Sequence, residues 1–276
     1  ADMQMIAEVY GLMRDGLGMA AGEIAGVFRG WNEGALKSYL VEISGEVAAA
    51  VDPVSGGPML DVILDSAGQK GTGRWTAVEA QHLGTPVPVI EAAVMARNAS
   101  ARRAERAAGE ARFGPGPQRL DSMAADTLEA ALIAGKILCY AQGFGMIAAA
   151  SGAFGWALDL PAIARVWRAG CIIRSSMLND MAEALAEDAA RNLMLAPGFA
   201  ARLEETVPAL RQVVAAGALN GLALPALSAG LAWFDTMRTA RGTANMIQAQ
   251  RDFFGAHGFQ RVDGIDRPHG PWGAGA

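Results

Sequence analysis

The chain has 276 residues, of which 52% are hydrophobic and 18% charged, so it can bury a large core and is too apolar to be disordered. Its formal net charge of −5 argues against a protein that coats nucleic acid, so an anionic ligand must find a local basic cluster. Cys139 and Cys171 lie in apolar segments and are predicted to be buried, reduced thiols. With the three histidines they show no zinc-ligand spacing, so no metal site is predicted.

The first part of the chain is predicted to be helical, because alanine and methionine are abundant and β-branched runs are scarce. Apolar residues three and four positions apart predict helices over about 2–17, 22–31 and 36–47. Gly and Pro residues at 52–58 predict a turn region, after which a short segment leads to residue 64.

Residues 64–76 form the most distinctive stretch, with three glycines, two cations and three hydroxyl side chains. Glycines allow backbone N–H groups to face a ligand, while Lys70 and Thr72 add a positive charge and a hydroxyl donor. This chemistry is typical of a loop that binds an anionic oxygen cluster, most simply a phosphate. Composition alone leaves open the alternative of a surface turn between two helices.

Two nucleotide-binding motifs are excluded in this loop. Gly68 and Gly73 have the spacing of a P-loop, but Arg74 and Trp75 stand where that motif needs Lys and Ser or Thr. A dinucleotide fingerprint fails as well, because Thr76 occupies the position of its third glycine. No cofactor-binding residue is therefore predicted.

The chain beyond the loop again predicts helices. The sequence TAVE at 76–79 matches a capping box, which predicts a helix that begins at Thr76. Pro86 and Pro88 separate this helix from the next, which is expected to run through Arg97 to about residue 110. Later helices are predicted over about 122–150, from Pro161, and over 172–190, 199–216 and 225–255.

The predicted fold class is all-α, with a large helical domain and an irregular C-terminal tail. The helical domain is predicted over 1–257, and the Gly- and Pro-rich tail over 258–276. Two uncharged stretches, between Lys136 and Asp159 and between Arg211 and Asp235, raise the alternative of a membrane protein. Glycines, Gln142 and a proline interrupt them, so we expect buried helices of a soluble core and no membrane partner.

A weak internal repeat is also present. Residues 7–11 resemble 141–145, and a Trp-x-x-Gly pattern follows each, at 31–34 and 167–170. The offset between the matches drifts by two residues. Two copies of one helical unit explain the pattern, and coincidence in an alanine-rich chain is the alternative.

Several longer motifs resemble the 6-phosphogluconate dehydrogenase family. They are SAGQKGTGRWT (66–76), WNEG (31–34) with SYL (38–40), WRAGCIIRS (167–175), and ANMIQAQRD (244–252) with FFGAH (253–257). The resemblance covers essentially the whole chain in order and implies a large helical domain of that type.

This resemblance implies NADP-dependent oxidative decarboxylation of 6-phosphogluconate to ribulose 5-phosphate, a step of the pentose phosphate pathway. The family has an N-terminal Rossmann domain, a helical domain and a tail, and the chain is similar to the last two. The catalytic lysine and glutamate of the family lie before the position that matches Ala1, so no catalytic residue is assigned here.

The resemblance assigns substrate-binding roles to five residues. Lys70, Thr72 and Arg97 match residues that bind the substrate phosphate, whereas Arg251 and His257 match residues donated to the neighbouring subunit's site. Without the resemblance, Arg97 and Arg251 are ordinary helix-surface cations and His257 has no special role. The chemistry of these side chains agrees with a phosphate ligand, because a phosphate dianion favours lysine, hydroxyl and planar arginine donors.

The leading hypothesis is the helical, phosphate-binding part of a cytoplasmic, homodimeric 6-phosphogluconate dehydrogenase whose N-terminal Rossmann domain binds NADP. This chain alone is expected to bind no cofactor and to have no dehydrogenase activity. The alternative is a stand-alone, non-catalytic phosphosugar-binding or dimerisation module. The sequence does not determine the choice between NADP and NAD, the affinity for substrate, or the role of the tail after His257.

Overall fold

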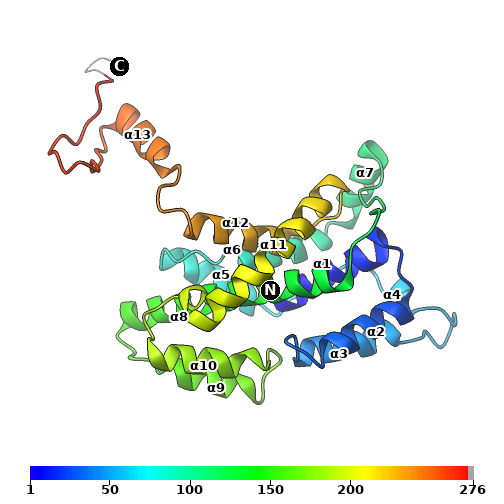
Figure 1. Ribbon diagram of the computed structural model, residues 1–276. Helices are drawn as coiled ribbons and strands as arrows, with labels where there is room; N and C mark the ends of the chain where they lie inside the picture. The colour runs from blue at the N-terminus through cyan, green and yellow to red at the C-terminus, as the bar shows by residue number, and fades with distance from the viewer. Residues whose placement is uncertain (273–276) are drawn as a thin grey trace. The chain divides into compact units, whose positions relative to one another are not determined.

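A computed structural model describes residues 1–272, which contain thirteen α-helices and no β-strand (Figure 1). The predicted all-α class is thus confirmed. The described residues divide into two compact units, 1–233 and 234–272, each considered by itself below. The predicted division at residue 257 stays a prediction, and residues 273–276 of the predicted tail lie outside the described residues.

Helices of the first unit fall into two similar series separated by α7 (Arg103–Phe113). The first series is α1 (Asp2–Gly11) with a π-helical turn η1 (Leu12–Gly16), α2 (Ala21–Trp31), α3 (Tyr39–Ala49), α4 (Met59–Val62), α5 (Thr72–His82) and α6 (Pro88–Ser100). The second series is α8 (Ala125–Phe154), α9 (Leu160–Arg168), α10 (Met177–Glu187), the 3-10 turn η2 (Leu193–Leu195), α11 (Pro197–Leu219) and α12 (Pro225–Met237), whose last residues belong to the second unit.

Helix α8 forms the centre of the first unit. It contacts α1, α6, α9 and α11, and Figure 1 shows α11 running close to it. Its length and apolar composition would allow it to span a membrane, but 56% of its most apolar window is buried within the protein. Burial of apolar side chains against four neighbouring helices is the arrangement of a core helix.

The weak repeat in the sequence corresponds to a repeat in the structure. In each half a first helix, α1 or α8, leads into a pair of packed helices, α2 with α3 or α9 with α10. The two pairs meet at an antiparallel bridge between Ser38 and Ser175, which follow the two Trp-x-x-Gly patterns. Equivalent parts of the two halves therefore contact each other directly.

Two buried polar side chains connect the halves a second time. Glu8 of α1 accepts hydrogen bonds from the backbone N–H groups of Ala226 (2.8 Å) and Leu227 (2.9 Å) at the start of α12. Gln142 of α8 accepts one from the N–H of Val89 (3.0 Å) at the start of α6. Each first helix thus satisfies free N–H groups at the start of the other half's last helix.

A buried ion pair connects the first helices themselves. Lys136 of α8 has a fully buried side chain, and its Nζ lies 3.2 Å from Oδ2 of Asp2 in α1. The same ammonium donates to Oγ of Ser38 at 3.1 Å. This cluster ties α1, α8 and the bridge between the helix pairs together.

Two predicted helices are each divided in the structure. The helix predicted through Arg97 to about 110 is broken between α6 and α7, at Ala101 and Arg102. The helix predicted over 225–255 consists of α12 and α13 (Ala244–Gly255), separated by residues 238–243. There the Thr239 hydroxyl bonds back to the carbonyl of Asp235 (2.6 Å), in a segment that also contains a glycine.

The predicted helix start at Thr76 is wrong. Helix α5 begins at Thr72, and the Thr76 hydroxyl donates to the Thr72 carbonyl (2.9 Å) inside the helix. The start lies four residues earlier because Gly71 adopts φ +114°, a conformation that glycine reaches without steric cost.

Candidate functional site

A pocket of about 680 Å³ lies where the glycine-rich loop meets α6 and the start of α1. The loop forms one wall with residues 68–73, and α6 forms another with Ile90, Val94 and Arg97. No acidic side chain lines this pocket within the described residues. In a protein of net charge −5, that makes the pocket locally basic.

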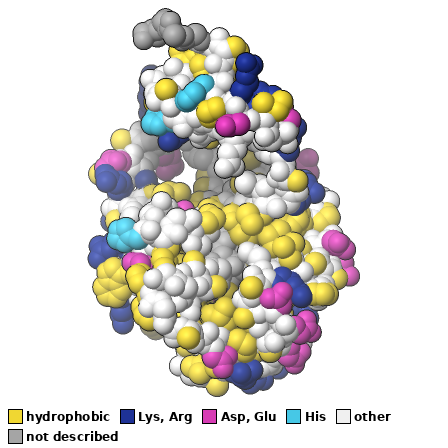
Figure 2. All heavy atoms as spheres, turned by 90° about the vertical axis from the view of Figure 1, so that its left-hand side faces the viewer, with side chains coloured by type: hydrophobic (Ala, Val, Ile, Leu, Met, Phe, Trp, Pro, Cys, Tyr) yellow, Lys and Arg dark blue, Asp and Glu magenta, His cyan; other side chains and the backbone are white. Residues whose placement is uncertain are grey.

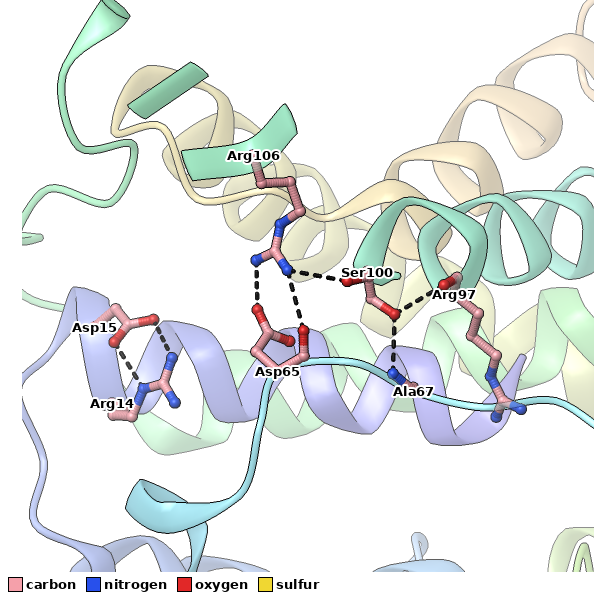
Figure 3. Close-up of polar contacts among 7 residues, drawn as sticks. All are labelled: Arg14, Asp15, Asp65, Ala67, Arg97, Ser100 and Arg106. Carbon is pink, nitrogen blue, oxygen red and sulfur yellow. Dashed lines mark hydrogen bonds and ion pairs between the residues drawn. The ribbon is translucent and has the colours of Figure 1, made fainter. Parts of the chain in front are cut away.

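Contacts with α6 hold the loop in place. Arg97 donates from Nη1 to the Gly68 carbonyl (3.4 Å), and Gln69 donates from Nε2 to Oδ1 of Asn98 (2.7 Å). The backbone N–H of Ala67 donates to the Ser100 hydroxyl (2.9 Å), which in turn donates to the Arg97 carbonyl (2.8 Å) (Figure 3). The end of α6 therefore binds three consecutive residues of the loop, Ala67, Gly68 and Gln69.

Arg106 of α7 anchors the beginning of the loop. Its guanidinium donates to the Asp65 carbonyl (3.1 Å), forms an ion pair with the Asp65 carboxylate, and reaches the Ser100 carbonyl (3.4 Å) (Figure 3). The sequence predicted only that a helix continues here to about residue 110. Sequence reasoning therefore missed Arg106, since one arginine among several on a charged helix carries no distinguishing signal.

The loop ends by placing the amino-terminal end of α5 at the pocket. Thr72 and Gly73 are its first residues and line the pocket, and the first turn of a helix carries N–H groups without partners in the helix. These groups and the helix dipole favour an anion. A side chain at Gly73 would bring a Cβ to 3.2 Å from Val94, so glycine allows α5 to pack closely on α6.

Three of the five predicted binding residues are therefore brought together. Lys70, Thr72 and Arg97 line the same pocket, with the exposed Lys70 on the loop and the half-buried Arg97 on α6. A point charge, a hydroxyl, a guanidinium and a helix amino terminus form a donor set suited to a phosphate dianion.

A second, mainly apolar cavity of about 460 Å³ adjoins the first and shares Thr72, Gly73 and Ile90 with it. Burial raises the pKa of the Cys139 thiol to about 11 and also raises the pKa of Tyr140, whose hydroxyl donates to the Ile173 carbonyl (2.9 Å). Both groups stay protonated at neutral pH and cannot serve there as general bases.

Arg251 and His257 lie in the second unit, on α13 and just beyond it. Both are exposed, and the His257 ring lies 5.8 Å from the ring of Phe254. The structure describes this unit by itself, so the relation of these two residues to the pocket stays a prediction.

The described residues contain no cluster of metal ligands and no dinucleotide-binding motif. Within residues 1–272 no group of three or more His, Cys, Asp or Glu side chains is close enough to hold a metal ion. The loop departs from both nucleotide motifs, and the described chain has no strand that could lead into a dinucleotide-binding turn. The pocket itself offers hydrogen-bond donors and positive charge to an anion.

Comparisons with known proteins identify a family. The family described as "6-phosphogluconate dehydrogenase, C-terminal domain" matches residues 1–272. The NAD(+)-dependent, decarboxylating 6-phosphogluconate dehydrogenase of Bacillus subtilis is 43% identical over 271 residues, which are 95% of this chain and 57% of that protein. The NADP(+)-dependent enzyme of the same organism is 42% identical over 276 residues, 98% of this chain and 59% of that protein.

A solved structure gives the same result. It is that of Plasmodium falciparum 6-phosphogluconate dehydrogenase, described in its apo form and in complex with its cofactor NADP+ and its substrate 6-phosphogluconate. The match has a TM-score of 0.94 and 36% identity, over 98% of this chain and 59% of that one. The chain thus spans less than two thirds of the length of each of these relatives.

Proposed function

The chain belongs to the 6-phosphogluconate dehydrogenase family, and we propose that it is the phosphate-binding, C-terminal part of a decarboxylating enzyme of that family. The observation that carries this proposal is the convergence of Lys70, Thr72, Arg97 and the amino terminus of α5 on one pocket. The ligand is the phosphate group of 6-phosphogluconate.

Each group has a distinct part in binding. Lys70 supplies a compact charge, Arg97 a planar fork of donors, and Thr72 a hydroxyl beside the first N–H groups of α5. Charge-assisted hydrogen bonds of this kind contribute about 1.5–3 kcal/mol each. By fixing the phosphate, the pocket sets the position of the sugar carbons that react.

The chemical step itself is assigned to residues outside this chain. The catalytic lysine and glutamate implied by the resemblance precede the position of Ala1, and the described residues do not fit a dinucleotide. We therefore assign NADP to an N-terminal domain and expect no dehydrogenase activity from the 276-residue chain alone. Reduction of NADP+ by the purified chain with 6-phosphogluconate would contradict this assignment.

A homodimer completes the proposal, with Arg251 and His257 of one chain serving the pocket of the other. Figure 2 shows hydrophobic side chains gathered in a broad band on one face of the molecule. Large exposed apolar side chains in the first unit include Trp75, Phe154, Trp156 and Val166. Such surface is consistent with a subunit interface. Light scattering is expected to give a dimer, and a monomer that binds substrate fully would contradict it.

The runner-up function is a stand-alone phosphosugar-binding or dimerisation module. It is favoured by one observation, that Lys70, Thr72 and Arg97 all lie within the first unit. A cytoplasmic location is proposed for either function. An upstream reading frame that encodes a dinucleotide-binding unit would decide for the dehydrogenase.

The decisive experiment is a calorimetric titration of the chain with 6-phosphogluconate. Lys70→Ala is expected to weaken binding at least about tenfold, which corresponds to about 1.4 kcal/mol, because a charged phosphate contact is lost. Lys37→Ala is the matched control, since Lys37 is an exposed lysine outside this pocket. Equal affinities of the wild type and Lys70→Ala would overturn the assignment of the phosphate to this pocket.

A further inference from the structure

Helix α13 buries an acidic residue. Asp252 is the one residue of Ala244–Gly255 that is buried in the described structure, with 3% of its surface exposed. Its aromatic neighbours Phe253 and Phe254 are 61% and 73% exposed. This inversion of the usual pattern needs a reason, because a buried carboxylate is stable only when its oxygens are hydrogen-bonded.

Four donors surround the Asp252 carboxylate, two at each oxygen. Oδ1 accepts from the backbone N–H of Gly258 (2.8 Å) and lies 2.7 Å from Nδ1 of His269. Oδ2 accepts from the backbone N–H of Gly270 (3.0 Å) and from Nε1 of Trp272 (2.9 Å). These hydrogen bonds, the one from Gly270 foremost, hold the pKa of Asp252 well below its usual range.

These bonds fold the chain after α13 back onto the helix. Ala256 at the helix end adopts φ +47°, which reverses the chain, and Gln248 of α13 donates to the Gly258 carbonyl. The returning segment is closed by a backbone bond from Phe259 N–H to the Pro268 carbonyl (2.8 Å). Residues 248–272 thus form one small folded body around Asp252.

Both substrate-binding residues proposed for the second unit belong to this body. Arg251 directly precedes Asp252, and His257 directly precedes Gly258, which Asp252 binds. The stretch between these anchors is short, and the His257 ring packs so closely that a Cβ at Gly255 would lie 2.7 Å from its Nε2. The position of His257 relative to Arg251 therefore depends on the Asp252 contacts.

We propose that Asp252 is a positioning residue that holds Arg251 and His257 as one preorganised pair for the substrate of a neighbouring chain. The proposal rests on the roles given to these two residues in the proposed function. Preorganisation matters because each freely rotating side chain that must be fixed on binding lowers the affinity.

The test compares Asp252→Asn with Asp263→Asn in the full 276-residue chain. Asparagine has the shape of aspartate, but its amide nitrogen cannot accept a hydrogen bond, so two of the four donors lose their acceptor. Asp263 is the control, since it lies in the same tail and pairs with Arg261 at the surface.

Two measurements by NMR report on geometry without ligand. Exchange of one of the two amide protons, that of Gly258 or that of Gly270, is expected to be at least about tenfold faster in Asp252→Asn, because the amide that faces the new side-chain nitrogen loses its acceptor. The ring-current shift that Phe254 exerts on His257 should be lost at the same time. Unchanged exchange or an unchanged shift would overturn the proposal.

A titration with 6-phosphogluconate then tests the functional part. Asp252→Asn should weaken binding about as much as Arg251→Ala, and the double variant should bind no worse than Arg251→Ala alone. Full affinity of Asp252→Asn, or additive losses, would leave Asp252 a purely structural residue and overturn its positioning role. If the wild type itself binds no 6-phosphogluconate, the proposed function fails, and the amide and ring-current measurements still decide whether Asp252 holds His257 in place.

Discussion

The two halves of the first unit share one order of helices, yet one half carries the pocket. In each, a first helix leads to a helix pair, and a glycine with positive φ, Gly84 or Gly221, precedes a helix that begins with proline. The halves differ just before that glycine. The first half has an open glycine-rich loop and the 11-residue α5, whereas the second has the 23-residue α11.

This difference shows how a site arises on a repeated scaffold. In the second half, the long α11 packs along α8 and exposes no helix start next to a glycine-rich loop. In the first half, the shorter helix α5 begins beside Lys70 and Arg97, so its free N–H groups face the pocket. The shared helices supply stability, and the loop supplies the chemistry.

The largest effect is expected where the two halves are joined by the buried pair. Lys136→Met removes the partner of Asp2 and leaves a carboxylate that is 12% exposed without its counter-ion. The loss should be about 3–5 kcal/mol in the free energy of unfolding, measured by urea denaturation. Lys136→Met combined with Asp2→Asn should recover part of it, and an equal loss in both would show that packing, rather than charge, is responsible.

A smaller effect is expected at the glycine that starts α5. Gly71→Ala should cost about 1–2 kcal/mol, because an L-residue at φ +114° is strained. The new Cβ would also lie 3.3 Å from the Trp75 ring, which should displace the loop and weaken 6-phosphogluconate binding.

The matched control for this variant is Gly84→Ala, at φ +61° in open space. It should lose stability by a similar mechanism but keep its affinity for 6-phosphogluconate, since it lies outside the pocket. Equal losses of affinity in the two variants would show that general destabilisation, not the loop, is responsible.

The smallest effect is expected from giving Glu8, which binds the start of α12, the same side chain as Gln142, which binds the start of α6. Glu8→Gln gives the first half the residue type that Gln142 supplies in the second. At neutral pH the change should be within about 1 kcal/mol, because one accepted hydrogen bond is lost while a buried charge is removed.

The pH dependence of this variant has a definite sign. Burial is the main cause that raises the pKa of Glu8 above its usual value. The folded state then takes up a proton more readily than the unfolded state, so the contribution of Glu8 to stability is full below the ordinary glutamate pKa and is lost as pH rises through the raised one. The stability of the wild type minus that of Glu8→Gln should therefore increase as pH falls from 7 towards 4. A constant difference would contradict the raised pKa.

Much of the fold follows from local sequence. Period-3.6 apolar patterns and prolines at first turns predicted most helices, and the SAGQKGTGRWT stretch predicted an anion-binding loop before any neighbour was known. The errors were one helix start and two predicted helices that are each divided in the structure. The capping-box pattern at 76–79 predicted a helix start that is too late, because the left-handed conformation of Gly71 allows α5 to begin at Thr72.

What the sequence determined by itself was the helical class, the locally basic loop and the family resemblance, since these depend on residues close together in the chain. Only the tertiary structure decided that Arg97 and Arg106 hold this loop, that Glu8 and Gln142 cap helices of opposite halves, and that Asp252 gathers four donors. These contacts join residues far apart in the sequence or separated by a reversal of the chain. No local pattern encodes them, because a hydrogen bond depends on distance in space.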